Sequence, residues 1–212
     1  MKRRLLSIVT VFFLISCGSA ENSNSSELPV KDEVENISTS SSVSGTFSVD
    51  VDSSVLKWES SKLVGSHHGV VSIVTGVITV GNGAVTQGAL TVDLSTIKEL
   101  DVEAEKAAKL ERHLKEADFF NVSEFPTASI VVTSVREGVV YADLTLKGKT
   151  KSIEFPASIL ITDESVSVTA KFTINRTDWG IVFGSGNFFT DLTKEKIISD
   201  DIKFGIEIKA KK

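Results

Sequence analysis

Apolar and polar residues alternate with a period of two over most of the chain from Ser44 onward. In the clearest run Val140, Ala142, Leu144 and Leu146 are apolar, and the residues between them are Tyr, Asp and Thr. Alternation of this kind indicates antiparallel strands with one face toward an apolar interior and the other toward water. Further runs of the same type lie at 56–60, 90–94, 153–161, 166–174 and 202–210.

Short polar or glycine-containing segments separate these runs and predict tight turns. Many strands joined by such turns, with one helix, predict a single all-β domain. The pattern alone leaves both a sandwich and a barrel open. The turn segments are Gly-Asn-Gly at 81–83, Glu-Gly at 137–138, Gly-Lys at 148–149 and Thr-Asp-Glu at 162–164.

One segment, 68–80, departs from simple alternation because it is apolar on both faces. Val71 and Ile73 lie on one face, whereas Val70 and Val74 lie on the other. A strand of this composition is expected to be covered on both sides. The sequence therefore predicts a second layer over this strand.

A helix is predicted at about 102–117 and is the natural candidate for that layer. Ala107, Leu110 and Leu114 recur at helical spacing, and Glu105 stands four residues before Lys109. The helix is amphipathic and should lie on the sheet. We expect it to cover the strand at 68–80.

The N-terminus resembles a bacterial lipoprotein signal. Lys2, Arg3 and Arg4 precede a short apolar run, and Leu-Ile-Ser at 14–16 precedes Cys17, the single cysteine of the chain. We expect a signal peptide at 1–16, a Ser-rich disordered tether at 17–43 with a lipidated Cys17, and a folded domain at 44–212. An ordinary signal peptide with an incidental cysteine is the alternative.

The charge balance is acidic. The formal net charge is −5, and removal of the three N-terminal basic residues leaves 20 basic and 28 acidic residues, or −8. This balance is unfavourable for nucleic acid and for electrostatic attachment to anionic lipid. Membrane attachment is instead expected through acyl chains on Cys17.

Several ordered motifs resemble the YceI-like polyisoprenoid-binding family. They include His-His-Gly at 67–69, HLKEADFFNVSEFPTASI at 113–130, LTLKGKTK at 144–151 and NRTDWGI at 175–181. The resemblance extends over about 44–210 and implies an eight-stranded antiparallel, lipocalin-like barrel with one covering helix. It also implies a long isoprenoid chain held inside the barrel.

The resemblance also directs the choice of candidate site residues. Aromatic residues are abundant, which fits an apolar tunnel and a filled core equally well. The tunnel candidates are Trp58, Phe119, Phe120, Phe155, Phe172 and Trp179. The candidates at the mouth, near a polar head group, are His67, His68 and Arg176. For Arg176, a salt bridge with Asp178 is the structural alternative to contact with an anionic head group.

Catalytic motifs do not stand out in this sequence. The patterns HExxH, CxxC and GxSxG do not occur. The adjacent His67 and His68 should point to opposite faces of a strand and so cannot form a two-histidine metal pair without a bulge. We therefore expect neither catalysis nor a cofactor, and assign no metal ligands.

The sequence hypothesis is a non-catalytic protein that sequesters an isoprenoid, a quinone-like lipid or a similar amphiphile. We expect it at the bacterial cell envelope, anchored by lipid in the outer membrane or periplasm, without nucleic-acid partners; a homodimer stays open. Two alternatives also stay open. One is a periplasmic scaffold or adhesion domain with a filled barrel, and the other is a metal-binding protein that uses His67 or His68 with a nearby carboxylate.

Overall fold

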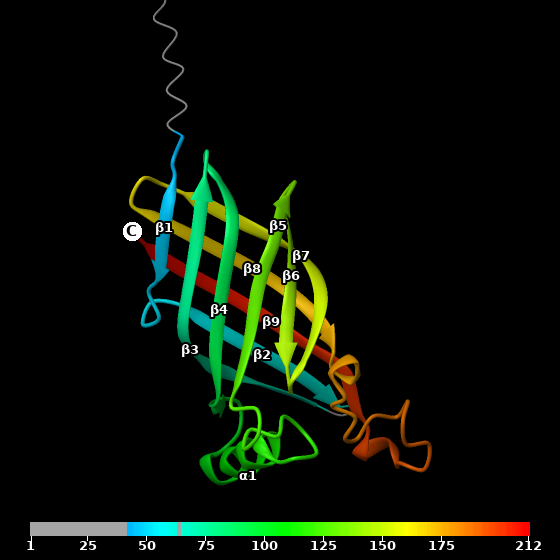
Figure 1. Ribbon diagram of the computed structural model, residues 1–212. Coiled ribbons are helices and arrows are strands. Elements are labelled where there is room, and N and C mark those ends of the chain that lie inside the picture. The colour runs from blue at the N-terminus through cyan, green and yellow to red at the C-terminus, as the bar shows by residue number, and fades with distance from the viewer. Residues whose placement is uncertain (1–41, 63–64) are drawn as a thin grey trace, which may run out of the picture. The chain divides into compact units, whose positions relative to one another are not determined.

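The computed structural model describes residues 42–62 and 65–212. The predicted signal peptide and nearly all of the predicted tether lie outside these residues. The described part is mainly strand, with one α-helix and two short 3₁₀ helices (Figure 1). The elements are β1 (Gly45–Val49), β2 (Val55–Lys62), β3 (Ser66–Gly81), β4 (Ala84–Glu99), α1 (Ala104–Lys115), β5 (Thr127–Arg136), β6 (Val139–Leu146), β7 (Lys149–Ile161), β8 (Ser165–Asn175), η1 (Arg176–Trp179), η2 (Lys194–Lys196) and β9 (Ile198–Lys211).

The strands form a closed antiparallel barrel. From β4 to β9 each strand pairs with the next, and β3 closes the sheet by pairing with β4. The short strands β1 and β2 share one place between β3 and β9, where β1 pairs with the second half of β3 and β2 with the first half. Nine segments therefore make eight positions, which confirms the predicted eight-stranded barrel with one helix.

Three tight hairpins connect neighbouring strands, two at the predicted residues and the third one residue before the predicted Gly148-Lys149 pair. Each has two central residues with positive φ, between 48° and 77°, as a type I′ turn requires. Glycine occupies the second position every time, because it adopts this conformation without steric cost. The turn residues are Asn82-Gly83, Glu137-Gly138 and Lys147-Gly148.

The prediction that 68–80 is covered on both faces is wrong, and a β-bulge is the reason. Ile73 pairs with Val92 and Thr75 with Thr91, so Val74 is an extra residue without a partner in β4. Before the bulge the odd-numbered side chains, such as Val71, point into the barrel, and after it the even-numbered ones, such as Ile78, do so. The side chain of Val74, at the bulge itself, is half exposed. A one-faced strand with a bulge has thus produced an apparently two-faced pattern.

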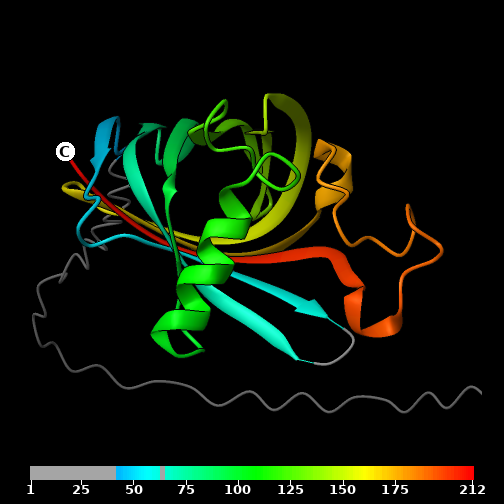
Figure 2. The same cartoon turned by 90° about the horizontal axis from the view of Figure 1, so that it is seen from below.

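The helix α1 accordingly covers a different part of the barrel from the one predicted. It contacts β4 and crosses the lower end of the barrel, as seen in Figure 2. Ala107 and Leu114 are its buried residues, in agreement with the predicted amphipathic face. None of the helices in the described ranges has the length and apolarity needed to span a membrane. The helix α1 thus covers part of one end of the barrel.

Candidate functional site

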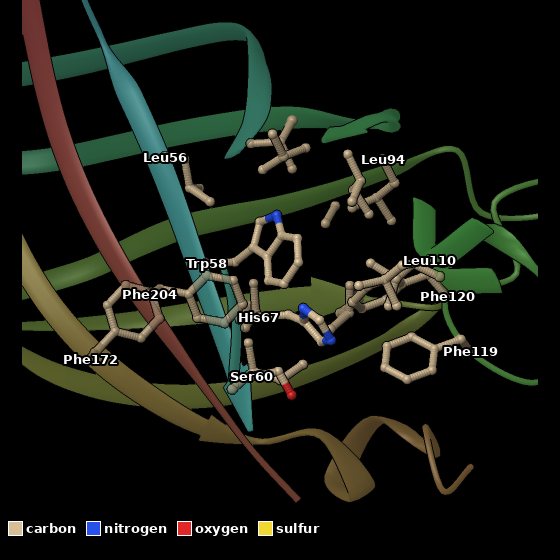
Figure 3. Close-up of a pocket in the computed structure, with 18 of the residues that line it drawn as sticks. Leu56, Trp58, Ser60, His67, Leu94, Leu110, Phe119, Phe120, Phe172 and Phe204 are labelled. Atoms are coloured by element: carbon tan, nitrogen blue, oxygen red, sulfur yellow. The ribbon is translucent and has the colours of Figure 1, made fainter. Parts of the chain in front are cut away.

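The barrel encloses a cavity of about 360 Å³ at the end that α1 covers (Figure 3). Almost all of its wall is apolar. Four of its six polar lining residues gather at one end, and the other two are His113 of α1 and Ser129 of β5. That end is formed by Ser60, Ser61 and Lys62 of β2 and His67 of β3. Other lining residues include Leu56, Trp58, Val71, Leu90, Val92, Leu94, Ile97, Leu110, Leu114, Phe119, Phe120, Leu144, Leu146, Phe172, Phe204 and Ile206.

A smaller cavity of about 80 Å³ continues into the barrel away from α1. Leu90, Ile130 and Ile206 line both cavities, so the two are neighbours separated by these side chains. Phe155 lines the smaller cavity and stacks on Phe172 of the larger one, with ring centroids 4.4 Å apart. The interior is therefore partly hollow, which contradicts the alternative of a filled barrel.

Four of the six predicted tunnel residues, Trp58, Phe119, Phe120 and Phe172, line the main cavity, and Phe155 lines the second. Their strands explain this placement, because Phe172 and Trp58 stand at inward positions of β8 and β2, as the alternation predicted. Phe119 and Phe120 lie in the turn after α1, where both rings are buried 4.9 Å apart.

Trp179 and Arg176 do not line either cavity. Both belong to η1, and both are buried in the barrel wall. The Trp179 indole N–H donates to the Leu144 carbonyl at 3.1 Å. The prediction that Trp179 is part of the tunnel is therefore wrong: its ring braces η1 against β6.

Arg176 is fully buried, and its guanidinium donates to three backbone carbonyls. Nη1 donates to Ile181 at 2.7 Å, Nε to Ser199 at 2.9 Å and Nη2 to Ile198 at 3.1 Å. Its acidic neighbour is Asp200 at 3.4 Å rather than the predicted Asp178. Because its donors are occupied and solvent does not reach it, Arg176 does not fit the predicted role at the mouth.

The opening of the main cavity is marked by its exposed lining residues. Lys62 is exposed, the side chain of His67 retains 36% of its accessible surface, and Phe183 retains 39%. Two more phenylalanines in the same loop, Phe188 and Phe189, are 57% and 44% exposed. The mouth thus carries both a polar side and an aromatic side.

His67 belongs to a cluster of histidines and carboxylates at the mouth. Its Nδ1 lies 3.1 Å from Asp101 Oδ1 and 3.9 Å from Glu99 Oε2. The neighbouring His68, which does not line the cavity, places its Nδ1 3.4 Å from Asp101 Oδ2. The two histidines therefore meet at a single carboxylate although they alternate along β3.

Burial and mutual contact shift the titration of the two acids. Glu99 is 3% exposed, and desolvation together with contact with Asp101 raises the pKa of its carboxyl. Contact with Glu99 and then with His67 lowers the pKa of the Asp101 carboxyl. Protonation of the pair therefore begins at Glu99, and Asp101 stays ionised.

The chain is matched by a family model for the YceI-like domain over residues 30–210. This chain is a member of the YceI-like family. The match covers most of the chain and confirms the resemblance read from the motifs.

Individual relatives of this YceI-like chain are more distant. UPF0312 protein SAS2572 of Staphylococcus aureus is 35% identical over 80 residues, which cover 34% of this chain and 47% of that protein. The chain thus spans about half the length of the curated relatives it matches.

Two solved structures share the fold. BcnA of Burkholderia cenocepacia is 16% identical with a TM-score of 0.55, covering 76% of this chain and 99% of that one. A polyisoprenoid binding domain from Saccharophagus degradans, described as implicated in plant cell wall breakdown, is 15% identical with a TM-score of 0.57, covering 78% and 97%.

Two glycines in the YceI-like motifs make room for aromatic rings near the cavity. Trp58 lies directly across from Gly69 of the His-His-Gly motif, and a Cβ there would stand 2.7 Å from the indole and only 1.8 Å from the Lys98 carbonyl oxygen of β4. Gly148 of the LTLKGKTK motif has φ +70° and would place a Cβ 2.5 Å from the Phe125 ring. These motifs therefore build the wall and the closure of the barrel.

Of the polar residues at the mouth, Ser60, Ser61 and Lys62 were not predicted, and three others were missed or undervalued in the sequence analysis. Glu99 and Asp101 received no role, and His113 was not among the site candidates, although it lines the cavity 4.5 Å from the Phe183 ring. One signal for Glu99 was available: Ile97, two residues earlier, is a buried lining residue on the same side of β4. Nothing in the local sequence distinguishes Asp101 from a solvated loop acid.

Proposed function

We propose that this YceI-like protein binds one long-chain amphiphilic lipid, an isoprenoid or quinone-like molecule, inside the barrel without catalysing a reaction. The observation that carries this proposal is the apolar cavity of about 360 Å³ with four of its six polar lining residues at one end. Ligand pockets typically range from about 300 to 1,000 Å³. The structural neighbour described as a polyisoprenoid binding domain supports the choice of ligand class.

Transfer of the chain from water supplies the affinity. Each methylene buried contributes about 0.8 kcal/mol. The chain would lie among Trp58, Phe120 and Phe172, and a longer chain would pass Leu90, Ile130 and Ile206 toward the second cavity. The number of buried carbons therefore determines affinity more than any single polar contact does.

The head group would stay at the polar end of the cavity. Ser60, Ser61, Lys62 and His67 offer hydroxyl, ammonium and imidazole groups there. Lys62 is exposed and suits an anionic or hydroxylated head without a desolvation cost. This arrangement favours an amphiphile over a pure hydrocarbon.

The site of action is proposed to be the cell envelope, with the chain anchored through acylated Cys17 in the outer membrane or facing the periplasm. The support is the lipobox-like sequence before Cys17 and the acidic charge balance. The exposed Phe183, Phe188 and Phe189 beside the mouth are of the kind that enters membrane interfaces. Lipid would pass between membrane and barrel at this aromatic side.

Native mass spectrometry of the full chain tests the proposal. Cys17→Ser prevents acylation, so the protein can be purified from bacteria without detergent and its bound molecules extracted. We expect about one isoprenoid or quinone-like lipid per chain, or uptake of one added polyprenyl lipid. A protein that is empty and takes up no added lipid would overturn the proposal.

A charge placed in the cavity separates this site from the surface. Phe172→Glu should abolish lipid uptake, because a carboxylate would be buried against the apolar chain. Thr173→Glu is the matched control, since its side chain is the next one along β8 and is exposed. Normal uptake by a folded Phe172→Glu variant would exclude the interior as the site.

A second variant without a buried charge tests the cavity even if Phe172→Glu does not fold. Ala128 is buried in the wall of the main cavity, so Ala128→Phe should fill part of it and reduce uptake. Circular dichroism establishes that each variant is folded before its uptake is measured.

A further inference from the structure

One oxygen of a buried carboxylate at the cavity mouth has no hydrogen-bond partner. The side chain of Glu99 has no accessible surface, and its Oε2 is unpaired among the described residues. Its other oxygen, Oε1, accepts the backbone N–H groups of Leu100 at 3.2 Å and Asp101 at 3.0 Å. A buried anionic oxygen without a partner is costly and calls for a compensating cation.

The atoms around Oε2 are metal-ligand atoms. His67 Nδ1 lies 3.9 Å away, and Asp101 Oδ1 lies 3.1 Å from the same nitrogen. Together the three residues can place one ligand atom each within 4.8 Å of one another. Ligand bonds of 2.0–2.2 Å in a tetrahedral zinc site separate ligand atoms by about 3.4 Å, so the two distances from His67, 3.1 and 3.9 Å, need little adjustment.

We propose that His67 Nδ1, Glu99 Oε2 and Asp101 Oδ1 form a binding site for a divalent transition-metal ion of the zinc class. One imidazole nitrogen and two carboxylate oxygens are ligands that zinc accepts, and three protein ligands leave a fourth position open. Two carboxylates also balance the double charge of the ion. The site lies at the cavity mouth because His67 itself lines the cavity.

The surrounding contacts hold these ligands in place. The two backbone donors fix Glu99 Oε1, which directs Oε2 toward His67. The Nδ1 of His68, at 3.4 Å, faces the second oxygen of Asp101 and acts as a positioning residue. The Glu111 carboxylate of α1 accepts the backbone N–H of Glu99 at 3.0 Å and so ties the end of β4 to the helix.

A second group of the same residue types serves as an internal comparison. His113, Glu116 and Asp118 can also approach one another, but Glu116 and Asp118 are both exposed. His113 Nε2 is buried without a hydrogen-bond partner, but neither carboxylate there is, so this group lacks the buried anionic oxygen that Glu99 supplies. The inference applies to the Glu99 cluster alone and does not depend on lipid binding.

Titration of the chelator-treated full chain carrying Cys17→Ser with zinc chloride tests the site. Calorimetry should find one ion per chain, and cobalt should give the intense visible absorption of a tetrahedral complex. Glu99→Gln keeps the shape but removes the anionic ligand, and should weaken zinc affinity by roughly 100-fold or more. Glu116→Gln is the matched control and should leave affinity unchanged.

A graded variant distinguishes coordination from a nonspecific acidic surface. His68→Ala should weaken zinc affinity by about 10-fold, as expected for a positioning residue, whereas His67→Ala should remove the cobalt spectrum. Absence of stoichiometric binding to the wild-type chain would overturn the inference. So would a Glu99→Gln variant with wild-type affinity, or loss of binding in Glu116→Gln alone.

Discussion

Arg176 and Glu99 are the two charged residues buried in the described part of the barrel, and their surroundings are opposite in kind. Arg176 donates to three carbonyls and has Asp200 beside it. Glu99 has two backbone donors on one oxygen and none on the other. Each nitrogen of the Arg176 guanidinium therefore has a hydrogen-bond partner, whereas one oxygen of the Glu99 carboxylate has none. We expect the first charge to stabilise the fold and the second to be available to a ligand.

Of the variants that test this comparison, Arg176→Met should lower the free energy of unfolding most. The change leaves Asp200 without its cation and three carbonyls without their donor, so the free energy of unfolding should fall by about 3–5 kcal/mol. Urea unfolding followed by tryptophan fluorescence measures it. Arg136→Met is the control, because Arg136 is exposed on β5 and its loss should cost less than about 1 kcal/mol. If both variants lost the same free energy of unfolding, the buried contacts of Arg176 would contribute nothing beyond those of an exposed arginine.

Asp200→Asn should lower the free energy of unfolding less than Arg176→Met does. Its Oδ2 accepts the Asn187 amide at 2.7 Å, and its Oδ1 lies 3.4 Å from the Arg176 guanidinium. The variant removes the counter-charge but keeps the three carbonyl contacts, so unfolding free energy should fall by about 1–2 kcal/mol. A loss as large as that of Arg176→Met would mean that the ion pair, rather than the carbonyls, stabilises η1.

Replacement of Glu99 should instead raise the free energy of unfolding. In chelator-treated protein at neutral pH, Glu99→Gln removes a buried charge without a full set of partners, so the variant should be more stable than wild type by about 0.5–1 kcal/mol. The same urea experiment measures this. A loss of stability comparable to that of Arg176→Met would show that the Glu99 carboxylate is structural.

The difference in stability between Glu99→Gln and wild type should depend on pH. Because the folded-state pKa of Glu99 is raised above 4.5, the folded protein binds the proton more tightly than the unfolded chain. The contribution of Glu99 to wild-type stability should therefore fall as pH rises from 4.5 through the raised pKa, and then level off. The stability gap between Glu99→Gln and wild type should widen over that window. A gap that is constant with pH would contradict the raised pKa.

The strands, the hairpins and most of the cavity wall could be predicted from local sequence. Alternation places Trp58 and Phe172 on inward faces, and three turn pairs fix where neighbouring strands meet. These features depend on periods of two and on glycine conformations, which a short window of sequence contains. The barrel itself was reached through the family motifs rather than through the pattern.

The errors arose where the chain departs from a regular period. At the bulge at Val74 the inward-pointing positions of β3 change from odd-numbered to even-numbered residues. The sequence of β3 therefore resembles that of a strand covered on both sides. The main-chain irregularity between Asp93 and Lys98 changes parity in β4 and turns Glu99 inward. Arg176 and Trp179 lie in a 3₁₀ turn that folds back into the wall, where strand alternation no longer applies. Such irregularities depend on pairing with distant residues.

The chain enters the barrel at the end opposite α1, where Gly83 donates its N–H to the Val43 carbonyl at 2.8 Å (Figure 1). If Cys17 anchors the protein, the link is therefore to the base of the barrel and not to its mouth. Attachment and lipid exchange would then use opposite ends of the barrel, and neither would have to be interrupted for the other.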